Sequence, residues 1–253
     1  CLEEAKRLGY AEADPTNDIE GYDAARKIAI LASIAFNSRV VDSDVFVEGI
    51  SNLQEIDIKY ARDLGYGIKM LGIAKEDHGQ IEVRVHPVLI PLQHPLAAVN
   101  DVFNAVFVSG DAVGDTMFYG RGAGELPTAS AVVGDIMESA RNIRQGVTGR
   151  IACTCFEDKR IKHMNETVSK YYIRLSVMDD PGVLSRISKA FGDNNVSLSS
   201  VMQKGHHNKQ GDPAQIVLIT HTVLEENVQK ALADTKALDC LYDVKALIRV
   251  EKR

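Results

Sequence analysis

One long apolar segment constrains this chain more than any other feature of its sequence. Residues 21–36 are predominantly apolar, and a helix that is apolar around its whole circumference is a buried one. At about 100° per residue, Asp23 and Lys27 fall on one stripe with Ile30 and Ile34. We therefore expect a buried helix in which an acid and a base, four residues apart, share a face with core residues.

The Asp23–Lys27 pair has two explanations. Ion pairs at this spacing are common at the rim of a core helix, where the acid offsets the cost of burying the ammonium. However, further carboxylates precede the helix, in a proline-broken segment that we expect to run as a loop. A solvated helix start needs only one or two acids, and Asn17 or Asp18 supplies a cap. The surplus indicates a site for a cationic, hydroxyl-bearing small molecule; its acids are Glu12, Asp14 and Asp18.

The run GYAEADPTNDIEGYDAARK at residues 9–27 resembles the signature of homoserine dehydrogenases. It has a glycine, an aromatic residue, Glu-x-Asp-Pro, an Asp, and then Gly-x-Asp with a Lys. The resemblance implies an oxidoreductase that interconverts L-homoserine and L-aspartate 4-semialdehyde with NAD or NADP. It would act in threonine, methionine and isoleucine synthesis in the cytoplasm.

The same resemblance implies a role for each polar residue of the run. Glu12 would bind the substrate ammonium, Asp18 would line the pocket, and Tyr10 would present its backbone to the substrate. Lys27 would be the catalytic acid or base on the substrate oxygen, held by Asp23. Aldehyde reduction does need a proton at the developing alkoxide, and a lysine supplies it best when partial burial lowers its pKa.

The chain has no GxGxxG between a strand and a helix, which a dinucleotide-binding domain would show. In the family, that domain precedes the signature. Residues 2–8 also read as the second half of an amphipathic helix. We therefore expect a carboxy-terminal fragment, inactive alone, whose NAD or NADP is bound mainly by the absent domain; no metal is assigned.

Composition excludes several other classes of protein. With 253 residues, 45% hydrophobic and 25% charged, the chain could form one large or two ordinary soluble domains. A net charge of −6 gives no nucleic-acid footprint, and no apolar run is long enough to span a membrane. We see no signal peptide. Cys1, Cys153, Cys155 and Cys240 lack zinc spacing and are interpreted as reduced cytosolic thiols.

The middle of the chain predicts an α+β layer, a mixed sheet with helices on one face. His86 and His94 lie in a proline-containing segment and are interpreted as loop-packing residues rather than site residues. A helix is expected at about 53–63, and strands at 68–75, 81–85, 104–108 and 116–119.

A second candidate site follows, in the segment YGRGAGELPTAS at residues 119–130. Glycines between a strand and a helix allow close backbone approach, and a helix amino end favours an anion or a dipole. By itself the pattern is more typical of a tight strand-to-helix turn than of a binding site. Homoserine dehydrogenases carry a matching GxGAGxxxTA segment at the nicotinamide end of the cofactor. That resemblance makes Gly122, Gly124 and Glu125 cofactor-binding candidates.

From residue 171 the order of elements is βαββαβ, which is ferredoxin-like. The segment DDPGVLSRISKAFGDNNVSLSSV resembles an ACT domain, a regulatory small-molecule module. By that resemblance Asp179, Gly182, Asn194 and Asn195 would lie near an effector site, with threonine as the suggested effector. The alternative is that the glycine and the asparagines only satisfy turn geometry.

We therefore predict three parts. Residues 1–150 form a substrate, catalytic and dimerisation domain, 151–170 a linker, and 171–253 an ACT regulatory domain. A homodimer or homotetramer is expected, because an exposed sheet and an ACT edge favour pairing. The alternatives are a non-catalytic amino-acid-sensing ACT protein on a dimeric scaffold, and a different semialdehyde or hydroxy-acid dehydrogenase sharing the sheet domain.

Overall fold

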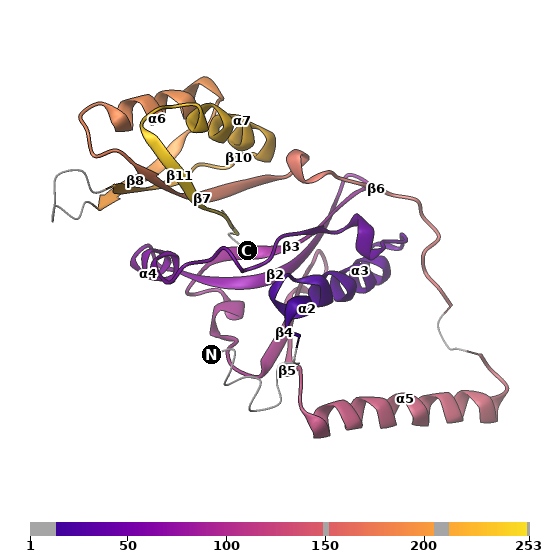
Figure 1. The fold of residues 1–253 in the computed structure, drawn as a ribbon. Helices are drawn as coiled ribbons and strands as arrows, with labels where there is room; N and C mark the ends of the chain where they lie inside the picture. Colours follow the sequence, from indigo (N-terminus) through magenta and orange to yellow (C-terminus); the bar gives the residue numbers. More distant parts are fainter. Residues whose placement is uncertain (1–13, 149–151, 205–212, 252–253) are drawn as a thin grey trace.

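The computed structural model describes residues 14–148, 152–204 and 213–251 (Figure 1). Tyr10 and Glu12 lie outside the described residues. Within the described residues, the chain forms a mixed sheet with helices on one face, followed by a ferredoxin-like βαββαβ unit, which confirms the predicted fold class. No helix in the described part is long and apolar enough to cross a membrane.

The amino-terminal region (residues 14–148) begins with the short helix α2 (Thr16–Ile19), where a loop was predicted. The main helix α3 (Tyr22–Phe36) follows at the expected place, but Gly21, with a φ of 82°, begins it rather than Asn17 or Asp18. A Cβ on Gly21 would lie 2.9 Å from Val85 Cγ1, so only glycine fits this junction.

Helix α3 packs on a long antiparallel hairpin of β2 (Tyr66–Asp77) and β3 (Gln80–Pro91). Both strands are longer than predicted. Helix α4 (Glu55–Asp63) lies at the other end of the hairpin, and β1 (Phe46–Val47) adds to β3 in parallel. Alternate β3 residues contact α3 and then α4, so both helices cover one face of the strand; Ile81, Val83 and Val85 pack in the α3 cluster, and Leu89 packs in the α4 cluster.

The strands β4 (Phe103–Gly110) and β5 (Gly114–Arg121) form a separate two-stranded sheet. The prediction that they belong to the main sheet is therefore wrong. Since the two strands pair only with each other among the described strands, alternation alone could not place them in the larger sheet. Helix α5 (Glu125–Gln145) follows and projects away from the rest of the molecule in Figure 1. None of its residues is buried.

The predicted linker contains ordered pairings. Strand β6 (Arg160–Ile161) pairs with β3, and Ser38 forms an isolated bridge to Glu157. A short 3₁₀ turn, Met164–Glu166 (η3), also lies in this segment, and two others occur earlier in the chain, at Asp42–Asp44 (η1) and Pro95–Ala98 (η2).

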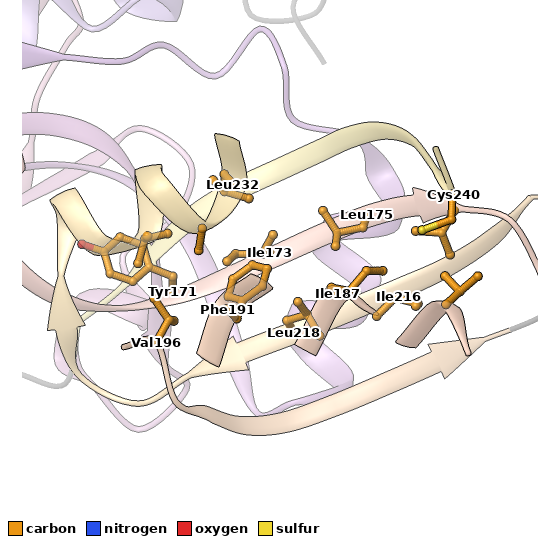
Figure 2. Close-up of a cluster of buried hydrophobic side chains, with 14 of the residues drawn as sticks. Tyr171, Ile173, Leu175, Ile187, Phe191, Val196, Ile216, Leu218, Leu232 and Cys240 are labelled. Atoms are coloured by element: carbon orange, nitrogen blue, oxygen red, sulfur yellow. The ribbon is translucent and has the colours of Figure 1, made fainter. Parts of the chain in front are cut away.

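The ferredoxin-like unit (residues 168–250) has antiparallel strands in the order β11-β7-β9-β8, the arrangement expected for βαββαβ. Two helices cover one face of this sheet and enclose the apolar cluster drawn in Figure 2. Residues 205–212, between β8 and β9, lie outside the described residues. The elements are β7 (Val168–Val177), α6 (Val183–Asp193), β8 (Leu198–Lys204), β9 (Ala214–Thr220), β10 (Val223–Leu224), α7 (Glu225–Lys236) and β11 (Leu241–Val250).

The two regions share one sheet, which the sequence did not predict. The end of β11 pairs in parallel with β3, with Arg249 opposite Val88 and Val250 opposite Leu89. The face of the ferredoxin-like sheet that points away from its own helices packs against α4. The last strand of the chain therefore joins the carboxy-terminal unit directly to the strand that supports α3.

Candidate functional site

Asp23 and Lys27 form the predicted ion pair on α3, with 2.6 Å between Asp23 Oδ2 and Lys27 Nζ. The prediction that their stripe is buried is wrong. The Lys27 side chain is 64% exposed, and Ile30 and Ile34 are 61% and 64% exposed. The buried face of α3 is formed instead by small residues, Ala25, Ala29 and Ala32.

The physical reason lies in how closely α3 approaches the sheet. A Cβ on Gly72 of β2 would lie 3.2 Å from Ile28 Cβ, so this glycine lets α3 lie close to the strand. The alanine face packs in the cluster with the sheet, and the larger apolar side chains of the exposed stripe lie on the opposite side of the helix. The Asp23–Lys27 pair is therefore an open, accessible site on the described residues, bordered by apolar surface.

Two of the acids that precede α3, Asp14 and Asp18, belong to the described residues. Asp14 Oδ1 accepts hydrogen bonds from Thr16 N at 3.1 Å and Thr16 Oγ1 at 2.6 Å, a local turn contact at the start of the short helix α2. Asp18 is exposed within α2. The predicted convergence of four carboxylates on Lys27 stays a prediction, because Glu12 lies outside the described residues.

Sequence reasoning missed Glu20, which fixes the junction between α2 and α3. Its carboxylate accepts a hydrogen bond from Ser51 Oγ, and a Cβ on Gly49 would overlap the same carboxylate. Ile50 N donates to Ile19 O at 3.0 Å. The loop at residues 48–51 is therefore held against the start of the candidate site, and no local pattern in the sequence signals this contact.

The glycine segment at 119–130 forms the strand-to-helix turn between β5 and α5. Gly122 N donates to Val102 O at 3.2 Å, and a Cβ on Gly122 would overlap the Asn104 side chain. Gly124 has a φ of 121°, a value that glycine adopts readily and other residues rarely do, and it begins α5 without a side-chain cap. Both glycines thus have a structural reason to be there, and the helix amino end is open.

An open amino end of a 21-residue helix fits a polar group of a nucleotide. Glu125 in its first turn adds a negative charge, which favours hydrogen-bond donors such as a carboxamide or a ribose hydroxyl over a phosphate. Arg121, just before the turn, lies over the Phe103 ring at 5.5 Å and is used in packing.

The four ACT candidates have local structural roles. Gly182, with a φ of 89°, begins α6, and Asn195 has a φ of 59° at its end. Asn194 Nδ2 donates to Ala190 O at 2.9 Å and to Asp234 Oδ2 at 2.7 Å, which ties α6 to α7. Asp179 is exposed and accepts from Gln203 Nε2 at 3.3 Å. These contacts agree with the turn-geometry explanation.

The two histidines differ. His94 packs as predicted, since its ring lies 5.0 Å from that of Phe107 and accepts from Leu96 N at 3.1 Å. The loop prediction for His86 is wrong, because it is fully buried within β3. Arg84 Nε donates to His86 Nε2 at 2.9 Å, and burial, with Arg249 and Arg84 nearby, lowers the pKa of His86 well below its ordinary value.

Comparison with known proteins gives these sites a context. The homoserine dehydrogenase family model matches residues 1–137, and the ACT domain model matches residues 171–240. The chain belongs to the homoserine dehydrogenase family. Helix α3 and the start of α5 both lie within the first match.

Homoserine dehydrogenases from two bacteria illustrate the likeness. The chain is 44% identical to that of Neisseria gonorrhoeae over 255 residues and 44% identical to that of Bacillus subtilis over 253 residues. Each alignment covers 99% of this chain and 58% of the relative. The chain therefore spans somewhat more than half the length of the curated relatives it matches.

Solved structures of homoserine dehydrogenases agree. The enzyme from Thiobacillus denitrificans superimposes with a TM-score of 0.90 at 43% identity, covering 99% of this chain and 57% of that one. The enzyme from Staphylococcus aureus gives a TM-score of 0.71 at 36% identity, covering 100% and 59%. The arrangement of the described elements is thus that of the family.

Proposed function

We propose that the protein carrying this chain is a homoserine dehydrogenase that interconverts L-homoserine and L-aspartate 4-semialdehyde with NAD or NADP. The observation that carries the proposal is the accessible Asp23–Lys27 ion pair at the amino end of α3, inside a full copy of the family signature. A small substrate can reach the Lys27 ammonium, which is held at a fixed place by a carboxylate 2.6 Å away.

In this proposal Lys27 moves the proton at the substrate oxygen, and Asp23 holds the lysine in position. Glu12 binds the substrate ammonium, Asp18 lines the pocket, and Tyr10 contributes its backbone. The nicotinamide supplies or takes the hydride. Gly122, Gly124 and Glu125 would lie against its carboxamide end, which suits the open amino end of α5.

A lysine acts better in proton transfer when it is partly desolvated, and the described residues leave Lys27 64% exposed. We propose that a nucleotide-binding domain, which the relatives' greater length accommodates, closes over α3 and excludes water from it. The 253-residue chain alone should therefore show no turnover. The regulatory effector is proposed to be an amino acid such as threonine, bound by the ACT unit near Asp179 and Gly182.

We further propose a homodimer or homotetramer in the cytoplasm. The β4–β5 ribbon supports the association of subunits, because this two-stranded sheet leaves large side chains exposed. Phe118 is 64% exposed and Tyr119 is 54% exposed. A ribbon of two strands has little stability of its own without such packing.

The test is turnover of homoserine by the protein that carries this chain together with its nucleotide-binding domain. Lys27→Ala should lower kcat by about 10³-fold, the range for loss of a general acid or base. Glu12→Ala should raise KM for homoserine. Lys59→Ala, an exposed lysine on α4, is the matched control and should leave both constants unchanged. Undiminished turnover in both Lys27→Ala and Glu12→Ala would exclude the assignment.

A further inference from the structure

The guanidinium of Arg249, near the end of β11, connects the two regions of the molecule. Its side chain is only 3% exposed. Two of its nitrogens, Nε and Nη2, donate to both oxygens of Glu225 on α7, at 3.0 and 2.8 Å. The third, Nη1, donates to Glu48 Oε2 at 2.6 Å, and the group lies 5.3 Å from the Phe46 ring.

The two carboxylates differ in how firmly they are fixed. Glu225 is 2% exposed, starts α7, and also accepts from the Tyr171 hydroxyl at 2.9 Å. Its two-pronged bond to the guanidinium therefore sets the position of Arg249 from the ferredoxin-like side. Glu48 lies in a loop and its side chain is 36% exposed. The Glu48 carboxylate is positioned by the remaining nitrogen of the guanidinium, Nη1.

From Glu48 the contacts continue to the candidate site. Glu48 N donates to Val85 O at 2.8 Å. Later in the same loop, Ile50 N donates to Ile19 O and Ser51 Oγ donates to the Glu20 carboxylate. Gly21 comes next and begins α3, which carries Asp23 and Lys27. Each step in this series is a hydrogen bond, an ion pair or a covalent link between ordered groups.

We propose that Glu48 and Arg249 are positioning residues that couple the ACT unit to the substrate-binding segment. Their ion pair holds the loop at 48–51 against the α2–α3 junction, and so sets where Asp18 and the Asp23–Lys27 pair lie. A ligand that shifts β11 or α7 then changes the affinity for substrate by way of Glu48. This inference rests on the proposed function for the identity of the substrate, and not for the coupling itself.

Hydrogen–deuterium exchange tests the coupling without any turnover. In the full protein, Glu48→Gln keeps the shape of the side chain and removes its charge. We expect amides of the loop at 48–51 and of residues 19–25 to exchange about 10-fold faster, because a local opening becomes easier. Strands β8 and β9 should be unaffected. Glu226→Gln, next to Glu225 on α7 but in a surface pair with Lys230, is the control and should change nothing at either place.

Kinetics test the consequence for substrate. Glu48→Gln should raise KM for homoserine about 10-fold with little change in kcat, a pattern that reports substrate binding. Arg249→Lys keeps the charge next to Glu225 but lacks the second arm, and it should raise KM similarly. In the Arg249→Lys background, Glu48→Gln should add little, since both changes break one interaction.

Three results would overturn the proposal: unchanged exchange at the loop and junction in Glu48→Gln, a uniform increase over the whole molecule, or additive effects of the two substitutions on KM. Absence of turnover in the unsubstituted protein would overturn the proposed function instead. The exchange experiment would then still decide whether the ion pair couples the two regions.

Discussion

The ferredoxin-like unit and the amino-terminal region differ in how far their apolar side chains are buried. In the unit, Ile173, Leu175 and Phe191 are fully buried between the sheet and its two helices (Figure 2). In the amino-terminal region, α3 leaves Ile30 and Ile34 more than half exposed, and α5 buries no residue. The ferredoxin-like unit thus completes its own core, whereas the surface around Lys27 stays open within the described residues.

The closed core and the open surface serve different purposes, the first for stability and the second for access. A closed core stabilises the fold but offers no access to a substrate, while an open apolar surface beside a lysine can be covered when a substrate or another domain binds. Covering the exposed stripe on α3 would remove water from around the Lys27 ammonium. Substitutions at a closed position, at the joint between the regions and at an open position test this contrast.

The largest effect is expected in the closed core. Phe191→Ala removes a fully buried ring between α6 and the sheet, and should lower the free energy of unfolding by about 4 kcal/mol, from lost burial and the cavity left behind. Urea unfolding followed by circular dichroism would measure it. A loss below 1 kcal/mol would show that this core is loosely packed, and the comparison would fail.

A smaller effect is expected at the joint, from His86. Its pKa in the folded protein is lowered, first by burial and then by Arg249 and Arg84, so the folded state stays neutral where the unfolded chain takes up a proton. Stability should therefore fall as the pH drops below about 6.5, at about 1.4 kcal/mol per pH unit until the folded pKa is reached.

Unfolding in urea at pH 7.5, 6.5 and 5.5 would measure this pH dependence. His86→Gln should flatten it, while His221→Gln, at an exposed position, should leave it as in the unsubstituted chain. If His86→Gln and the unsubstituted chain lose stability equally over this interval, His86 is not the group responsible.

The smallest effect is expected on the open stripe. Ile34→Ser changes a side chain that is 64% exposed, so the free energy of unfolding of this chain should change by less than about 0.5 kcal/mol. The same substitution in the longer protein should lower the free energy of unfolding more, because a domain closing over α3 would bury the serine. A loss above 1 kcal/mol in the 253-residue chain would mean that Ile34 is covered even there.

The candidate site was predicted from the sequence to different depths. The position of α3 and the pairing of Asp23 with Lys27 followed from local spacing, because residues four apart on a helix must be neighbours. The burial of that stripe was wrongly predicted, because burial depends on what lies opposite the helix. The close approach of Ile28 to Gly72 is a contact between segments about 40 residues apart.

The carboxy-terminal unit shows the same division. Its order of strands and helices could be predicted from the sequence, since each element carries its own periodicity and turn residues. That β11 would continue beyond its own unit and pair with β3 could not be read, because backbone pairing between distant strands leaves little trace in side-chain pattern.

Residues close together in the chain were enough to predict the longer helices and strands, the signature around Lys27 and the family. Local sequence could not predict which face of α3 is open, nor that Arg249 contacts both Glu225 and Glu48, because both depend on long-range packing. The physical reason is that hydrogen bonds and ion pairs act over a few ångströms. Residues 48 and 249 come within that range only after the two regions join in one sheet.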